Sequence, residues 1–269
     1  MKKYRWWLGL LVGMIVIFLW WRHSSRNFHH IYMQSQTHQF DDVESVTIGT
    51  YNLKSLNMGE SLEEAIVDLR AANLDIVCLQ EVDEKSWRSI HLAMTKEIAD
   101  ALGYEYYAFF QTMFLGQGYY GIAIISRYPI MEISSQSLKV SLLKEPRVLA
   151  KAKIDVGKTP LNIYTTHLSF RPLEDKYAQM TFLQNQFKNC QRTVLLGDFN
   201  IFRDEDFFEI EGMTSVNNAS RYLITFGDFG FPDNIYYSVD LGFTNPDVFK
   251  TSFSDHHLLH GKLILEGEK

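Results

Sequence analysis

Residues 193–201 read TVLLGDFNI, an apolar run that is followed by two polar side chains. Its apolar run predicts a buried strand, which stops at the carboxylate of Asp198 and the amide of Asn200. An unpaired charge in a protein interior is strongly destabilising, so a buried strand alone does not explain Asp198. Either Asp198 caps a polar turn or it belongs to an active site, and the other strand ends distinguish these interpretations.

Further apolar runs predict strands along the chain, and helical periodicities lie between some of them. The other predicted strands cover residues 45–52, 74–82, 121–129, 148–156, 161–169 and 261–266. Apolar residues at helical spacing predict helices over 61–73, 86–104 and 173–189, with Gly103 as a C-cap of the second. Strands and helices mix without strict alternation, which favours stacked mixed sheets with outer helices in one α/β domain over residues 45–266.

The predicted strands and the segments after them repeatedly end in a carboxylate, an amide or an imidazole. These residues are Asn52, Glu81, His167, Asp198, Asn200, Asp233, Asp255 and His256. Carboxylate and amide oxygens are the ligands that Mg²⁺ and Mn²⁺ prefer, and histidines can carry a proton or stabilise an oxyanion. The chain has no G-x-S-x-G, H-E-x-x-H or P-loop motif, and its two cysteines lack zinc-binding spacing. This set favours metal-assisted attack of water on a phosphate ester.

The motifs that carry these residues also occur in the order seen in a known family. They are TYN, LQEV, GIAIISRYPI, THLS, LLGDFN, PDNIYYS and SDHH. Over about residues 46–264 the chain resembles the endonuclease/exonuclease/phosphatase family, which includes DNase I, exonuclease III, neutral sphingomyelinases and inositol-polyphosphate phosphatases. The resemblance implies a four-layer α-β-β-α sandwich of two packed mixed sheets with the site at one edge. It also implies a phosphoesterase that uses a divalent metal, Mg²⁺ or Mn²⁺.

The resemblance implies metal binding at three positions. Glu81 is similar to the principal metal ligand of the family, Asn52 lies beside it, and Asp255 completes the group. Arg147, in KEPRVLAKAKI, is either a phosphate-positioning residue or merely a charged residue at the start of a strand. The second histidine of SDHH, His257, is expected to be exposed and without a role.

The same resemblance implies catalytic roles at five further positions. Asp198 would orient or deprotonate the attacking water, and Asn200 would hold the phosphate or that water. His256 would pair with Asp233 and carry a proton or stabilise an oxyanion. His167 would stabilise charge on the phosphoryl oxygens.

The N-terminus predicts a single-pass membrane anchor over residues 1–22. Residues 6–21, WWLGLLVGMIVIFLWW, form an uncharged apolar run with paired tryptophans and basic flanks, which is typical of a membrane-embedded segment. No small-residue cleavage site follows, which favours an uncleaved anchor over a signal peptide. Residues 23–44 are polar and predict a tether. The basic N-terminus favours a cytoplasmic end, which would place the domain outside the cell membrane.

Charge and motif details bear on the substrate. The formal net charge is −6, and because residues 1–26 hold five basic and no acidic residues, residues 27–269 carry −11. That acidity argues against a basic clamp on nucleic acid, and a membrane anchor would suit a phospholipid headgroup. Ile122, however, stands where sphingomyelinase-like members carry Asn, which resembles the nuclease branches. Nucleic acid is therefore slightly favoured as the substrate, and a phospholipid headgroup is the alternative.

A catalytically inactive, membrane-tethered binding module is the third interpretation. Loss of activity usually removes the metal ligands first, and here the implied ligands are all in place. The chain is therefore expected to be an enzyme, a phosphodiesterase that acts as a monomer.

Overall fold

The computed structural model describes residues 7, 9–18, 29–33, 43–251 and 253–265. Its strands are β1 (His29–Met33), β2 (Ser45–Asn52), β3 (Ile76–Glu84), β4 (Tyr106–Leu115), β5 (Gly118–Ser126), β6 (Ile130–Leu138), β7 (Arg147–Ile154), β8 (Leu161–His167), β9 (Thr193–Asp198), β10 (Met213–Ser215), β11 (Asp233–Ser238), β12 (Gly242–Phe249) and β13 (Leu258–Ile264). Its helices are α2 (Leu62–Ala72), α3 (Met94–Leu102) and α4 (Leu173–Phe187), with short 3-10 turns η1 (Lys54–Asn57), η2 (Trp87–Ser89) and η3 (Asp204–Asp206).

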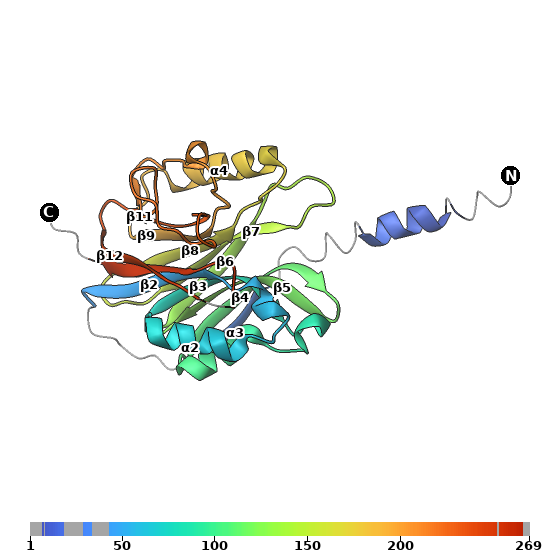
Figure 1. The fold of residues 1–269 in the computed structure, drawn as a ribbon, viewed down its shortest axis with the longest axis horizontal. Helices are drawn as coiled ribbons and strands as arrows, with labels where there is room; N and C mark the ends of the chain where they lie inside the picture. The colour runs from blue at the N-terminus through green and yellow to red at the C-terminus, as the bar shows by residue number, and fades with distance from the viewer. Residues whose placement is uncertain (1–6, 8, 19–28, 34–42, 252, 266–269) are drawn as a thin grey trace.

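The strands form two mixed sheets. One sheet is seven-stranded, in the order β1-β4-β5-β3-β2-β13-β12, and the other is six-stranded, in the order β10-β11-β9-β8-β7-β6. The pairs β2–β3 and β8–β9 are parallel, whereas their neighbours pair antiparallel. Figure 1 shows α2 and α3 over the outer face of the first sheet and α4 over the outer face of the second. This confirms the predicted two packed mixed sheets with outer helices.

The alternation of side chains along each strand explains the layers. In β9, Val194 and Leu196 face the core between the two sheets, whereas Leu195 faces α4. In β3, Cys78 faces the core between the sheets, and Leu79 faces the side covered by α2 and α3. Such strands are apolar throughout because both of their faces are buried. A charged residue can therefore follow them only where the strand leaves the core.

The second predicted helix differs from the structure. Residues 86–104 were expected to be helical throughout, but α3 begins only at Met94, and Gly103 is its C-cap as predicted. Ile90 and His91 have left-handed φ angles of 53° and 58°, which end η2 and separate it from α3. The apolar residues before Met94 therefore belong to a loop that follows β3, and one of them, Ile90, is exposed.

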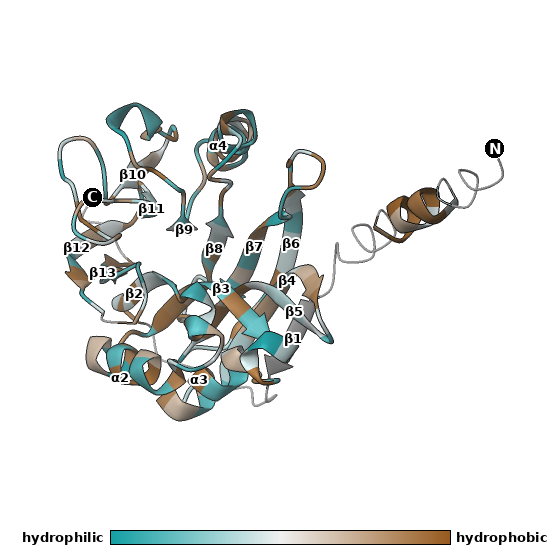
Figure 2. Ribbon diagram, turned by 45° about the vertical axis from the view of Figure 1, so that its right-hand side comes forward, coloured by the Kyte–Doolittle hydropathy of each residue, from teal (hydrophilic) through white to brown (hydrophobic). Residues whose placement is uncertain are grey.

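The N-terminal region contains two described segments. Trp7 and residues 9–18 are helical, and Figure 2 shows this segment as strongly hydrophobic. No helix within the described part of the chain combines the length and apolar character that a membrane span requires. Within the range predicted as a tether, β1 pairs with β4 at the end of the first sheet. The rest of the predicted anchor and tether lies outside the described residues.

Candidate active site

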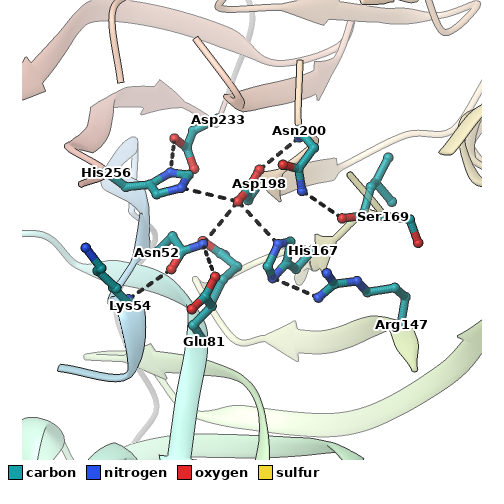
Figure 3. Close-up of polar contacts among 12 residues, drawn as sticks. Asn52, Lys54, Glu81, Arg147, His167, Ser169, Asp198, Asn200, Asp233 and His256 are labelled. Carbon is teal, nitrogen blue, oxygen red and sulfur yellow. Dashed lines mark hydrogen bonds and ion pairs between the residues drawn. The ribbon is translucent and has the colours of Figure 1, made fainter. Parts of the chain in front are cut away.

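Asp198 lies at the centre of a polar cluster where the ends of strands from both sheets meet (Figure 3). It is the last residue of β9, directly opposite His167 of β8 and Asp233 of β11. Gly197 precedes it with φ of 152°, and a Cβ at this position would lie 2.1 Å from the Thr166 carbonyl oxygen. Only glycine therefore allows β9 to pass this close to β8 and deliver Asp198 to the cluster.

The Asp198 carboxylate faces four N–H groups from separate parts of the chain. Its Oδ1 accepts the backbone N–H of Asn200 at 2.8 Å, and its Oδ2 accepts the Asn52 side-chain N–H at 3.0 Å. His167 Nε2 and His256 Nε2 lie 3.4 Å and 3.6 Å from the same Oδ2. Burial nevertheless raises the pKa of Asp198 to about 6, because the charged His256 and these donors offset the desolvation only in part.

The predicted contact between His256 and Asp233 is present. His256 Nδ1 lies 2.9 Å from Asp233 Oδ2, and both side chains are buried. Burial alone would lower the pKa of His256, but the carboxylates of Asp233 and Asp198 outweigh it and raise the pKa to about 10. His256 is therefore an imidazolium between two carboxylates at neutral pH. Ser254 Oγ fixes this loop by donating to the Asn52 carbonyl oxygen at 2.9 Å and accepting the His256 N–H at 3.1 Å.

His167 is held in the opposite protonation state. Arg147 Nη1 donates to His167 Nδ1 at 3.1 Å and to Glu145 Oε1 at 2.6 Å. Because a guanidinium can only donate, Nδ1 is an acceptor and the ring proton is on Nε2, facing Asp198. Burial, Arg147 and His256 together hold the pKa of His167 well below its usual range, so the ring is neutral. Arg147 therefore orients His167 in addition to lining the cleft.

Glu81 enters the cluster through an irregularity in β3. The pairing of β3 with β5 shifts register between Leu79 and Val82, and Glu81 has a left-handed φ of 55°. Such a bulge redirects one side chain out of the alternating pattern, and a strained φ of this kind is frequent at functional sites. Asn52 donates to Glu81 Oε1 at 3.1 Å. Burial raises the pKa of Glu81, and the nearby Asp198 carboxylate raises it further.

Two of the predicted residues have contacts that the sequence does not indicate. Asp255 lines the same cleft as Glu81 but is half-exposed and pairs with Lys54 at 3.2 Å. Asn200 donates its side-chain N–H to the Leu168 carbonyl oxygen at 2.8 Å, so it also fixes the loop after β8. The expectation for His257 is wrong, because this residue is buried. Its Nε2 lies 3.1 Å from the Gly227 carbonyl oxygen, and its role is to hold that loop.

These side chains line a cleft with a volume of about 660 Å³. Its lining includes Glu81, Arg147, His167, Asp198, Asn200, Asp255 and His256, as well as residues that the sequence analysis did not single out: Lys54, Glu145, Phe170, Arg171, Leu173, Lys176, Phe202, Arg203, Asp206 and Phe226. Phe226 packs edge-on against the His256 ring, with centroids 5.0 Å apart. The cleft thus combines an acidic side, cations and an aromatic wall, which suits an anionic ester with an apolar part.

Carboxylate oxygens in this cleft fit a divalent metal ion. Glu81 is a largely buried carboxylate beside the carboxylate of Asp198, and a bound cation would offset the repulsion that raises its pKa. Glu81 and Asp255, with the amide oxygen of Asn52, offer the hard oxygen donors that Mg²⁺ and Mn²⁺ prefer.

A second group of potential ligands is less suited to a metal. Asp198, Asp233 and His256 offer atoms that all lie within 4.8 Å of one another. The His256 imidazolium already lies between both carboxylates, and a doubly protonated imidazole has no lone pair for a metal. This geometry favours proton transfer at His256 and metal binding on the Glu81 side of the cleft.

Known proteins share these features. The family model described as the Endonuclease/Exonuclease/phosphatase family matches residues 49–256. The protein YbhP of Escherichia coli is 26% identical over 187 residues, which cover 64% of this chain and 72% of YbhP. A solved endonuclease/exonuclease/phosphatase from Beutenbergia cavernae superposes with a TM-score of 0.66 at 18% identity, covering 84% of this chain and 72% of that chain.

Two further solved structures have the same fold at low identity. The mannosyl-6-phosphatase Bt3783 of Bacteroides thetaiotaomicron has a TM-score of 0.62 at 17% identity, covering 81% of this chain and 99% of that chain. A humanized TDP2 of D. rerio has a TM-score of 0.65 at 16% identity, covering 82% and 99%. The family match spans most of the chain and includes the polar cluster around Asp198. The chain therefore belongs to the endonuclease/exonuclease/phosphatase family, whose members are hydrolases acting on phosphoesters.

Proposed function

We propose that this protein is a divalent-metal-dependent phosphodiesterase that hydrolyses a phosphate ester by attack of water. The observation that carries the proposal is the convergence of Asn52, His167 and His256 N–H groups on one oxygen of Asp198. The Asp198 carboxylate, a proton acceptor, and three N–H donors therefore lie around one point in the cleft. Water activation and stabilisation of phosphoryl oxygens need both kinds of group at that point.

The two histidines supply different functions in this scheme. Their Nε2 atoms lie 3.4 Å and 3.6 Å from Asp198, too far for strong hydrogen bonds, so both N–H groups can turn to phosphoryl oxygens. The neutral His167 can donate its Nε2–H hydrogen bond to a phosphoryl oxygen, but it does not transfer this proton at neutral pH. The His256 imidazolium, held by Asp233, can donate its proton to the leaving oxygen.

Asp198 is the group that accepts the proton of the attacking water. With a pKa of about 6 it is a carboxylate at neutral pH and still a stronger base than an ordinary aspartate. Asn52, Glu81 and Asp255 would hold the metal ion, which when bound supplies polarisation of the phosphoryl group and neutralisation of its charge.

The predicted location also belongs to this proposal. The apolar run over residues 6–21 and its basic flanks support an N-terminal anchor with the catalytic domain outside the cell membrane. Nucleic acid and phospholipid headgroups are the two candidate substrate classes, and the experiment must distinguish between them.

The experiment offers four substrates to the full-length protein in detergent. These are plasmid DNA, RNA, sphingomyelin vesicles and the soluble ester bis(p-nitrophenyl) phosphate, each with Mg²⁺ or Mn²⁺ and again with EDTA. Asp198→Asn removes the proton acceptor, and Asp228→Asn, an exposed residue outside the cleft lining, is the matched control. Hydrolysis that EDTA and Asp198→Asn abolish, and Asp228→Asn preserves, supports the proposal. Hydrolysis that survives EDTA, or no hydrolysis of any ester, contradicts it.

A further inference from the structure

Large apolar side chains project into solvent from the loops around the mouth of the cleft. We call this set the apolar rim, and it consists of Met58, Trp87, Ile90, Phe114, Leu142, Leu143, Phe170 and Phe229. Ile90 and Leu143 are 75% and 71% exposed, which is unusual for residues whose burial would be favourable. Scattered exposed apolar residues need no explanation, but a set gathered around a binding site indicates an interaction surface.

Strand register places the apolar rim at the edge of the sheets that carries the active site. In the first sheet, Trp87 and Ile90 follow the end of β3 at Glu84, and the β4–β5 hairpin with Phe114 lies beside them. Trp87 N–H donates to the Gly116 carbonyl oxygen of that hairpin at 3.0 Å. Trp87, Ile90 and Phe114 therefore lie in neighbouring loops on the side of the first sheet.

Loops of the second sheet supply a further part of the apolar rim. The loop with Leu142 and Leu143 leads directly into Arg147, at the start of β7 and near the end of β8. From Phe170, after β8, a chain of aromatic contacts runs through Phe202 and Phe226 to Phe229, with centroid distances of 5.6, 5.4 and 6.2 Å. The apolar rim thus surrounds the cleft from both sheets.

Exposed basic residues accompany the apolar tips. Lys85 stands two positions before Trp87, Lys144 follows Leu143, and Arg171 follows Phe170, and all three are exposed. Exposed acidic residues stand beside Met58 and Phe229, so the cations accompany only the Trp87, Leu143 and Phe170 parts of the apolar rim. Separate exposed apolar side chains mixed with Lys and Arg fit the surface of an anionic bilayer. The apolar side chains would insert between the lipids, and the cations would contact the headgroups. A peptide partner would instead need a continuous groove or a free strand edge.

β1 lies beside the strand that leads to one part of the apolar rim. β1 pairs antiparallel with β4, with His29 opposite Phe110 and Met33 opposite Tyr106. Because β4 runs towards the β4–β5 hairpin, β1 begins on the hairpin side and runs away from it. The apolar helical residues 9–18 precede the start of β1 in sequence.

We propose that the apolar rim docks on an anionic phospholipid bilayer and that the cleft hydrolyses the phosphoester of a membrane lipid. The substrate part of this inference rests on the proposed phosphodiesterase function, whereas the docking part does not. Docking would bring lipid headgroups to the metal-binding side of the cleft, and the aromatic wall next to His256 would contact the apolar part of the lipid.

The test measures which side chains of the full-length protein enter the bilayer. In a Cys190→Ser background, the variants Ile90→Cys and Leu143→Cys carry an environment-sensitive fluorophore on the apolar rim. Val67→Cys, on α2, and Val239→Cys, in the turn after β11, are controls of similar exposure away from the rim. The protein is incorporated into vesicles of phosphatidylcholine and phosphatidylglycerol, with nitroxide groups on the acyl chains as quenchers.

Quenching by the acyl-chain nitroxides at positions 90 and 143, but not at 67 and 239, supports docking. Equal accessibility of all four labels to aqueous iodide overturns it. If single-stranded DNA protects the labels at 90 and 143 from iodide and vesicles do not, the apolar rim binds nucleic acid and the proposal is also overturned.

Activity separates this inference from the proposed function. The double variant Ile90→Ser with Leu143→Ser should lose about 100-fold in hydrolysis of vesicle lipid, the equivalent of two apolar side chains no longer buried, and keep its rate on bis(p-nitrophenyl) phosphate. Equal rates of the variant and the wild type on vesicle lipid overturn the inference. Labels that insert in a protein without hydrolytic activity support docking and contradict the proposed function alone.

Discussion

Asp233 keeps His256 charged without lining the cleft itself. In Asp233→Asn the imidazole loses the carboxylate that holds its proton, so the proton donor of the proposed reaction is weakened. We expect kcat on a soluble phosphodiester to fall by about 10²- to 10⁴-fold with little change in KM. Steady-state kinetics test this, with Asp228→Asn as the control. A kcat equal to that of the wild type would show that His256 does not act through Asp233.

Arg147 controls the tautomer of His167. Arg147→Met removes the donor to Nδ1, so the ring can place its proton there and present a bare Nε2 to the cleft. We expect kcat/KM to fall by about 100-fold, the usual effect of losing one preorganised donor. Lys151→Met, in the same strand but outside the cleft lining, is the matched control. If both variants have equal kcat/KM, Arg147 is only a charged residue at the start of β7.

Sequence alone indicates most of the residues at the centre of the site. Asn52, Glu81 and Asp198 follow apolar runs, and a polar group after such a run must leave the core at a sheet edge. Lys54 and Lys176 could not be found this way because their partners lie far away in sequence. His257 was assigned wrongly because nothing in SDHH indicates that Thr225 and Gly227 fold back over it.

At the scale of elements, α4 and η3 support the loop after β9 through a buried ion pair. Lys176 Nζ lies 2.7 Å from Asp206 Oδ2 and donates to the Asn200 carbonyl oxygen at 3.3 Å. Lys176→Met leaves Asp206 with Arg203 and Tyr177 as its remaining partners, so we expect a loss of about 1–3 kcal/mol in the free energy of unfolding. Denaturant unfolding measures this loss.

Matched variants distinguish the buried pair from a general effect of charge. Lys176→Met with Asp206→Leu should recover most of the loss, because no unpaired charge is left in the interior. Lys188→Met breaks the exposed pair with Glu211 and should change stability by no more than about 0.5 kcal/mol. Equal losses in the single and double variants would contradict this account of the loop.

The junction of β3 and α3 predicts a dependence of stability on pH. Burial raises the pKa of Glu84 from 4.5 to about 7, despite the Thr95 hydroxyl and amide beside it. The folded state therefore holds this proton more tightly, and the contribution of Glu84 to stability falls as pH rises from about 4.5 to about 7. Between about pH 4 and pH 8, the fall in the free energy of unfolding should therefore be smaller in Glu84→Gln than in the wild type, by about 3 kcal/mol.

Urea unfolding at the two pH values tests this prediction. Glu63→Gln, an exposed acidic residue of α2, is the control and should leave the pH dependence of the wild type unchanged. If Glu84→Gln also leaves it unchanged, the Glu84 carboxyl titrates normally in the folded protein.

Elements with a regular pattern were predictable, and irregular ones were not. The predicted strand over 45–52 coincides with β2, and the predicted helix over 173–189 contains α4. The bulge at Glu81 has no signature in LQEV, since it arises from the mismatch of β3 with β5. The helix expected over 86–104 was wrong over its first half because Ile90 and His91 adopt left-handed backbone angles.

At the scale of the whole molecule, a bound metal ion would fix the loop before β13 against β2 and β3 of the seven-stranded sheet, because its proposed ligands come from these three places. Mn²⁺ should therefore raise the thermal midpoint of the full-length protein, by the equivalent of about 2.7 kcal/mol at a hundredfold excess over Kd. Glu81→Gln should abolish this shift, whereas Glu132→Gln, exposed on β6, should keep it. Differential scanning calorimetry with Mn²⁺ and with EDTA measures it, and a shift that survives Glu81→Gln would place the metal elsewhere.

The overall architecture followed from the sequence because two-sided apolar strands require covering layers on both faces. The distribution of exposed residues did not, since Trp87, Leu143 and Phe229 are apolar in sequence and only their positions around the cleft show a surface. The membrane anchor and the extracytoplasmic location stay predictions.

We have proposed that the cleft around Asp198 is a metal-dependent hydrolytic centre with Glu81 as a metal ligand. The rate of phosphodiester hydrolysis against Mn²⁺ concentration, in the wild type and in Glu81→Gln, tests this claim. We predict saturable activation of the wild type and a loss of about 100-fold or more in Glu81→Gln, with the substrate still bound. Hydrolysis at the wild-type rate in Glu81→Gln, or a wild-type rate that does not depend on Mn²⁺, would contradict the claim.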